Sequence, residues 1–182
     1  MRKVVLMIMA AAMLVSCGTS GKAAKETVKT YVQPGADLLN APGVLRAWAV
    51  GVSDSQMAAK KKAMVSASSQ LAQTLNSVVT TTIEDYCVKL SDADAAVSKE
   101  FLNKKCSSVS QQVLVGVRPI FEQWEPVDAE GKHKIYIVLE LSGEEFIKKL
   151  LEAIGQSQGT SNVKIDEQLL GDIFNQKVNS GK

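Results

Sequence analysis

Side chains able to do chemistry are scarce in this chain of 182 residues, where three cysteines and one histidine stand out. The first cysteine, Cys17, comes at the end of an apolar run from Val4 to Val15, which itself follows Arg2 and Lys3. A positive start, an apolar stretch and small residues at its end are typical of a secretory signal peptide. The run is shorter than the roughly 20 residues that a membrane-spanning helix needs. We therefore expect export.

The four residues Leu14-Val15-Ser16-Cys17 resemble the lipobox of exported bacterial lipoproteins. The resemblance implies that residues 1–17 hold a lipoprotein signal peptide, which is removed before Cys17, and that the Cys17 thiol carries lipid into a membrane. Several acyl chains make such an anchor stable, because each buried CH₂ contributes only about 0.8 kcal/mol. In lipoproteins with this motif the residue after the cysteine influences sorting, so the resemblance implies, with Gly18 in place of aspartate, the outer rather than the inner membrane of the cell envelope. The alternatives are an ordinary signal peptide cut near Ser16 or a short membrane anchor.

The two remaining thiols, Cys87 and Cys106, would lie in an oxidising compartment. An even pair of cysteines in that setting usually forms a disulfide, and we predict one between them. Closing a loop of this length would stabilise the fold by roughly 3 kcal/mol in the chain-entropy model. Two separate buried thiols are the alternative. A redox site is disfavoured because no Cys-x-x-Cys spacing occurs.

Nothing in the sequence indicates catalysis or a cofactor. His133 stands alone beside a predicted turn, between Lys132 and Lys134, and no hydrolase, phosphate-loop or metalloprotease motif is found. One histidine and two free thiols are too few for a zinc site. Without Arg2 and Lys3 the chain has 19 basic (21 − 2) and 19 acidic residues, so it lacks the positive charge that nucleic acids require. We expect a non-enzyme with no metal, no cofactor and no nucleic-acid partner.

A first strand is predicted over Val44–Val52, after a polar tether and leader at residues 18–42. Alternation divides this strand into a face of small residues, from Leu45 to Gly51, and a second face with Arg46 and Trp48. The small face would let a helix lie close. A long amphipathic helix is predicted from Ser53 to Tyr86, since no glycine or proline interrupts it, with Ser53 and Gln56 as a capping box.

Further elements follow the same patterns of spacing. A helical insert is expected within 88–107, then strands over Val113–Trp124 and His133–Leu141 that form a hairpin. A helix should begin at Ser142 with a second capping box and end at Gly155. Residues 156–182 read as a linker followed by an amphipathic segment at 166–178, either docked on the domain or offered to a partner.

The order of these elements predicts one α+β domain over residues 43–155, in the order β-α-(α)-β-β-α, with a three-stranded antiparallel sheet packed under the long helix. The segment Leu45-Arg46-Ala47-Trp48-Ala49-Val50-Gly51-Val52 and the alanine-rich helix after it resemble the LPP-twenty lipoprotein family. That family is similar to the N-terminal domain of the flagellar T protein. Ser53 departs from the family's second glycine. The resemblance implies an envelope lipoprotein and no catalytic residues.

Two classes of function fit these expectations. A binding or scaffold module would use the sheet face turned away from the helix, with another envelope protein or a second copy as partner, because aromatic and arginine side chains are enriched at interfaces. That face could equally be covered by the chain's own terminal segments. The alternative is a carrier of a small apolar ligand in a cleft between sheet and helix. The expected face residues are Arg46, Trp48, Arg118, Tyr136 and Glu140.

Overall fold

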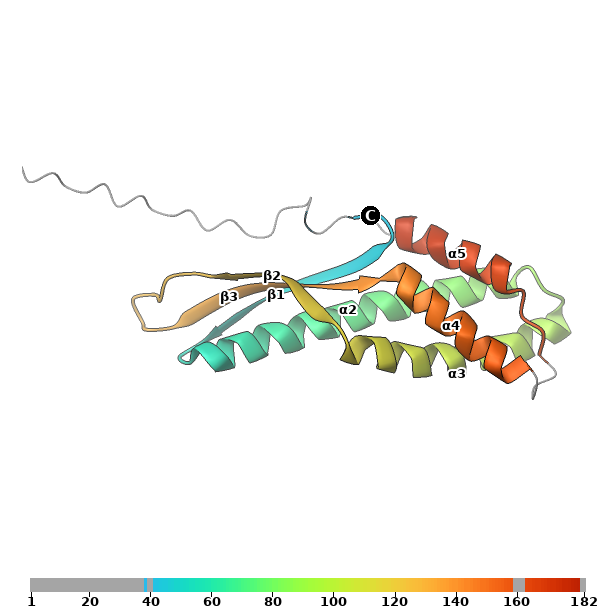
Figure 1. The fold of residues 1–182 in the computed structure, drawn as a ribbon, viewed down its shortest axis with the longest axis horizontal. Helices are drawn as coiled ribbons and strands as arrows, with labels where there is room; N and C mark the ends of the chain where they lie inside the picture. Colours follow the sequence, from blue (N-terminus) through green and yellow to red (C-terminus); the bar gives the residue numbers. More distant parts are fainter. Residues whose placement is uncertain (1–37, 39–40, 159–162, 181–182) are drawn as a thin grey trace, which may run out of the picture. The chain divides into compact units, whose positions relative to one another are not determined.

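The computed structural model describes Leu38, residues 41–158 and residues 163–180, all within one compact unit, Tyr31–Lys182. The predicted signal peptide, Cys17 and most of the tether and leader lie outside these residues. Within these residues the fold is α+β, with a three-stranded antiparallel sheet and four helices, as the sequence predicts (Figure 1). In chain order the elements are β1 Val44–Ser53, α2 Gln56–Cys87, α3 Asp92–Val115, β2 Arg118–Trp124, β3 His133–Ser142, α4 Gly143–Gln158 and α5 Glu167–Ser180.

β3 is the central strand, and the sheet order is β1-β3-β2. β1 pairs with β3 over its whole length, so that Val44 lies opposite Ser142 and Ser53 opposite His133. β2 is an edge strand with a register shift between Pro119 and Phe121. Pro119 accounts for an irregularity at this point, because proline lacks a backbone donor for the ladder.

The predicted small face of β1 packs directly on α2. Ala47 and Ala49 of the strand and Ala59 and Ala63 of the helix are all buried. Side chains of this size let the two backbones approach each other. At Gly51 the approach leaves no room for a side chain, since a Cβ built there would stand 1.9 Å from the carbonyl oxygen of Ala59. Glycine is therefore required at this crossing.

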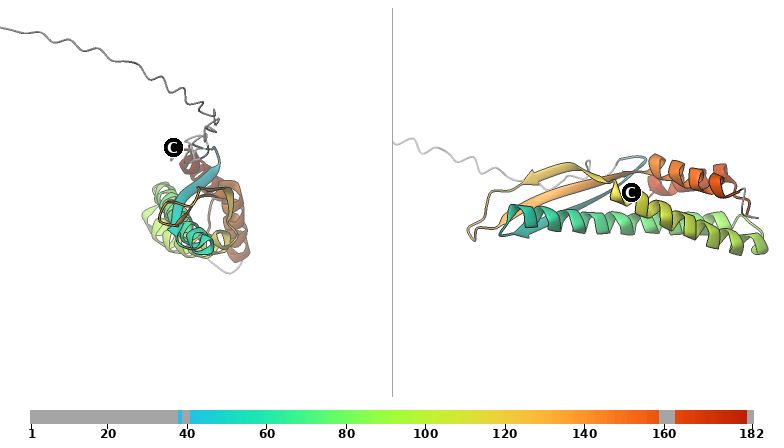
Figure 2. Two further views of the ribbon diagram at one scale, coloured as in Figure 1. Left: turned by 90° about the vertical axis from the view of Figure 1, so that its left-hand side faces the viewer. Right: turned by 60° about the horizontal axis from the view of Figure 1, so that its bottom comes forward.

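α2 runs beneath the sheet and continues beside α3, while α4 and α5 lie across from that helix pair, beyond the end of the sheet (Figures 1 and 2). The buried residues of α2 recur every three or four positions, as expected of one side of a helix. The C-terminal half of α2 packs against α3 and α5 and belongs to a core made of helices, whereas its N-terminal half packs against the sheet. The largest fully buried side chains are Tyr86, Phe146, Phe174, Leu71, Leu75, Ile83, Leu102, Ile135, Ile137, Leu139, Leu150 and Ile154.

Three predicted boundaries are wrong. β1 continues to Ser53, so α2 begins at Gln56, and its N-cap residue is Ser55, without a side-chain cap hydrogen bond. α3 extends to Val115, through the start of the predicted second strand and beyond the predicted insert at 88–107. α4 does not end at Gly155 but continues to Gln158. The capping box of α4 is formed in part, because the Glu145 amide donates to Ser142 Oγ at 3.2 Å.

The predicted disulfide is also absent, and Cys87 and Cys106 are free thiols. Cys87 is the last residue of α2, and its thiol donates to the carbonyl oxygen of Ala95 at 3.6 Å. Cys106 lies 14 positions after Asp92 in α3, about 21 Å along that helix at 1.5 Å per residue. A disulfide requires Cα atoms within about 7 Å, so the length of α3 keeps the two thiols apart.

The C-terminal segment is docked on the domain. The amide of Asp166 donates to the Tyr86 phenol oxygen at 2.8 Å, and the amide of Leu169 to Asp166 Oδ1 at 3.0 Å, which caps α5. The Phe174 and Phe146 rings stack with centroids 5.1 Å apart. The sequence analysis left two alternatives for this segment, docking on the domain or presentation to a partner. The buried apolar face of α5 shows that the segment is docked.

Candidate functional site

The five predicted face residues come together on the sheet surface that faces away from α2, called here the open face. One row crosses all three strands, because Arg46 of β1 and Arg118 of β2 both lie opposite Glu140 of the central strand in the strand register. A second row, Trp48, Val138 and Phe121, lies directly beside it in the same register. The open face therefore has a charged row next to an apolar row.

The charged row is asymmetric. Arg46 places Nε at 2.7 Å and Nη2 at 2.6 Å from the same Glu140 oxygen, and its Nη1 donates to the carbonyl oxygen of Leu38 at 2.5 Å. Charge-assisted bonds of this kind are among the stronger hydrogen bonds in proteins. Arg118 is exposed and has no ion-pair partner among the residues that the structure describes. One guanidinium is thus held in place, while the other is free to bind a partner.

The apolar row is partly open to solvent. Trp48 and Phe121 are half-buried, whereas Val138 between them is fully buried. Flanking strand residues extend the apolar surface, with Ile120 at the bulge 43% exposed and Val52 at the end of β1 40% exposed. Accessible aromatic rings beside a free guanidinium are a combination enriched at protein interfaces.

Tyr136 departs from the prediction, because it is buried and does not belong to the accessible part of the open face. It lies on the central strand between Val50 and Gln123. Lys134 places its ammonium 5.0 Å from the centre of the Tyr136 ring and 3.2 Å from a Glu125 oxygen. The hydrogen bond with Tyr136 and the neighbouring Glu125 raise the pKa of Lys134.

Phe121 is the open-face residue that the sequence analysis missed. Simple alternation from Arg118 would place Phe121 on the opposite surface, and only the register shift after Pro119 brings it beside Val138. A proline inside a predicted strand was the available signal, since bulges reverse which residues face which way.

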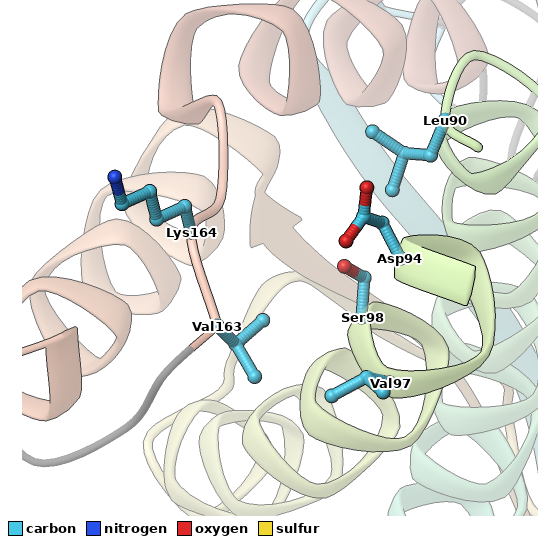
Figure 3. A pocket seen from close by; sticks show the side chains of 6 residues that line it. All are labelled: Leu90, Asp94, Val97, Ser98, Val163 and Lys164. Atoms are coloured by element: carbon cyan, nitrogen blue, oxygen red, sulfur yellow. The ribbon is translucent and has the colours of Figure 1, made fainter.

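A second candidate site is a cavity of about 420 Å³ between α3 and the segment that leads into α5. Figure 3 shows Asp94 and Ser98 side by side on α3, Val163 directed toward Val97, and the Lys164 ammonium pointing away. Asp94 already accepts a hydrogen bond from Ser91 at 2.6 Å. A ligand here would meet a carboxylate and a hydroxyl on apolar walls.

Three further searches give no indication of a metal site or a membrane-spanning helix in the described part of the chain, or of a family. Within the described ranges, no three side chains of histidine, cysteine, aspartate or glutamate gather as a metal site would require. Among those same residues, no helix has the length and apolar character to cross a membrane. No family model, no curated protein and no solved structure matches the chain. The resemblance to the LPP-twenty family stays a prediction.

Proposed function

We propose that this chain is a lipid-anchored lipoprotein of the bacterial envelope, and that it acts as a non-catalytic assembly module that binds another protein through the open face. The anchor rests on the sequence Leu14-Val15-Ser16-Cys17. Gly18 favours the outer membrane as its location. The binding role rests on the geometry of the sheet.

One observation supports the binding role above the others. Arg118 is exposed and unpaired among the described residues, although Glu140 of the neighbouring strand lies opposite it in register. Glu140 is already engaged by two nitrogens of Arg46. An unpaired arginine next to Trp48 and Phe121 suits a partner that offers a carboxylate together with an apolar side chain, because hot spots of binding are enriched in tryptophan and arginine.

The partner is either a different envelope protein or a second copy of this chain. A second copy would have to present an acidic group to Arg118, and Glu140 is not available for that purpose while Arg46 holds it. This consideration disfavours a symmetric dimer of two open faces, in which Arg118 would meet the same face of the second copy.

The experiment compares a Trp48→Ala, Arg118→Ala double variant with the parent chain, cross-linked in cells of the native host and purified by an affinity tag. We expect the double variant to lose at least about 90% of the cross-linked partner, since each hot-spot truncation costs about 2 kcal/mol or more. A matched control changes Lys61 and Val65, an exposed cation and an exposed apolar residue on α2, to alanine. An unchanged yield of partner in the Trp48→Ala, Arg118→Ala variant would refute the proposed binding face.

A carrier of a small, largely apolar ligand is the second candidate, at a cavity other than the predicted cleft between the sheet and the long helix. The cavity beside Asp94 and Ser98 has a volume in the range of ligand pockets. Its carboxylate and hydroxyl favour a polar group on the ligand, and it lies away from the sheet. Native mass spectrometry of protein purified from its own envelope separates the two candidates, because a retained small mass favours the carrier and a bound protein favours assembly.

A further inference from the structure

A groove between α2 and α3 is lined by uncharged hydrogen-bonding side chains. It has a volume of about 320 Å³ and lies on the helical part of the domain. Val79, Cys106 and Leu114 supply its apolar portion, and no charged or aromatic side chain is found among the described residues that line it. Its six polar residues are Asn76, Thr80, Asn103, Ser107, Ser110 and Gln111.

None of these six side chains makes a hydrogen bond to another described residue. Other hydroxyls of α2 do have partners, since Thr74 and Thr82 donate hydrogen bonds to carbonyl oxygens one turn back, at 3.0 and 2.7 Å. Ser110 is only 6% exposed, and leaving a buried hydroxyl unpaired is costly. The groove therefore holds a set of donors and acceptors without internal partners.

The surface of α2 beside the groove also lacks charged side chains. No charged residue occurs from Ala63 to Ile83 in α2, although many of these positions are exposed. A solvated helix face ordinarily carries charges. The uncharged lining of the groove and the uncharged α2 surface beside it favour an uncharged ligand, because no lining side chain would compensate a buried charge.

The spacing of the polar groups matches an extended polypeptide. Asn103, Ser107 and Gln111 follow one another at intervals of four residues along α3, about 6 Å each. Asn76 and Thr80 repeat this interval on α2. Two residues of an extended strand rise about 6.6 Å, so successive side chains of α3 can meet alternate peptide groups. Each amide side chain offers both a donor and an acceptor, as a peptide group does.

We propose that the α2–α3 groove binds about four residues of an extended, uncharged polypeptide segment, chiefly through the backbone of that segment. Amide side chains recognise peptide groups without regard to sequence, and the limited volume selects small side chains. A saccharide fits less well, because the groove has no aromatic ring against which a sugar could pack. This site is separate from the open face and does not depend on the proposed function.

The test uses the full-length chain in detergent and fluorescein-labelled, end-capped peptides of six residues made of alanine, serine and asparagine. Fluorescence anisotropy should detect saturable binding. The same peptides with N-methylated backbones keep their side chains but lose their backbone donors, and we expect them to bind at least about ten-fold more weakly.

Variants locate the site. Asn103→Ala with Gln111→Ala should weaken binding about ten-fold or more, because two hydrogen bonds are lost. The matched control, Lys104→Ala with Ser108→Ala, changes exposed neighbours on the same helix that do not line the groove, and should leave affinity unchanged. Trp48→Ala and Arg118→Ala should also leave it unchanged, which separates this site from the open face. Circular dichroism melting curves verify that each variant is folded.

Three results would overturn the inference. The first is the absence of peptide binding at concentrations of about 1 mM, the weakest affinity that a specific site would show. The second is equal binding of the N-methylated peptides. The third is binding of diacetylchitobiose, in place of the peptides, with the same sensitivity to the groove variants, which would assign the groove to a neutral sugar.

Discussion

At the scale of single residues, position within the fold decides which polar side chains are available. Arg46 and Arg118 face the same carboxylate of Glu140, but Arg46 also binds the Leu38 carbonyl oxygen and so is fixed in place. Arg118, on the edge strand, stays exposed. The two arginines therefore have different roles although the sequence presents them alike.

The pH dependence of stability should report the burial of Cys106. Burial raises the pKa of its thiol to about 12, well above the ordinary value. Because the folded state keeps this proton while the unfolded state loses it, the contribution of Cys106 to stability is complete below the ordinary thiol pKa of about 8.5 and is lost as pH rises toward 12. Urea unfolding should show that, from pH 8 to 10, the free energy of unfolding of the wild type falls by up to about 1.4 kcal/mol per pH unit more than that of Cys106→Ala.

Cys87→Ala is the matched control for that measurement. Its thiol is half-buried, and its pKa is raised by desolvation against the opposing charge of Lys99. A smaller change of slope is expected. If the free energies of unfolding of wild type and Cys106→Ala ran parallel across this pH range, the thiol would not be buried as the structure has it. Alkylation of Cys106 only after unfolding would support the same conclusion.

At the scale of elements, close approach of β1 to α2 is the contact on which the sheet depends. Gly51 has no room for a side chain, since an added Cβ would meet the Ala59 oxygen at 1.9 Å and the Ala63 nitrogen at 2.8 Å. Both neighbours are backbone atoms in a long helix. Relief of the clash therefore requires the helix to move as a unit.

Gly51→Ala should destabilise the domain by about 3 kcal/mol or more, at the upper end of the cost of overpacking. Urea denaturation of the two proteins measures this directly. Gly155→Ala is the control, because its nearest neighbour to an added Cβ is 3.9 Å away and alanine is the better helix former, by up to about 1 kcal/mol. Equal stabilities of Gly51→Ala and wild type would mean that β1 and α2 lie further apart.

At the scale of the whole domain, the last helix closes the structure onto its first strand. Asn179 of α5 accepts a hydrogen bond from the Gly43 amide at 3.0 Å, and the Gly43 carbonyl accepts one from the Gly143 amide at 2.9 Å. Lys177 also pairs with Asp85 of α2 at 2.5 Å. The docked α5 is thus part of the same compact unit as the sheet.

The proposed membrane anchor can be tested on the full-length chain. Cys17→Ser should remove lipidation, because serine cannot form the thioether, and the protein should then stay in the aqueous phase of Triton X-114 while wild type enters the detergent phase. Several acyl chains at about 0.8 kcal/mol per buried CH₂ make this difference large. Cys87→Ser should partition like wild type. Aqueous partitioning of the wild-type protein would contradict the anchor.

Local patterns were enough to predict the principal elements of the fold. Alternation placed Ala47, Ala49 and Gly51 on one side of β1, and the absence of glycine and proline extended α2 to Tyr86. The same reasoning failed from Val113 to Val117, where alternating valines are typical of a strand. Val113 is nevertheless buried inside α3 and Val115 is 89% exposed on it, because packing of that helix on α2 and α4 outweighs the preference of valine.

The sequence by itself determined the class of fold and the faces of β1, since these depend on neighbours along the chain, and the prediction of export rests on the sequence alone. Only the tertiary structure decided that Arg46, Glu140 and Arg118 share one row, that Cys106 lies far from Cys87, and that six uncharged side chains meet between α2 and α3. Strand register and helix length result from contacts between residues distant in sequence. Such contacts follow from how the whole core packs, and no local pattern records them.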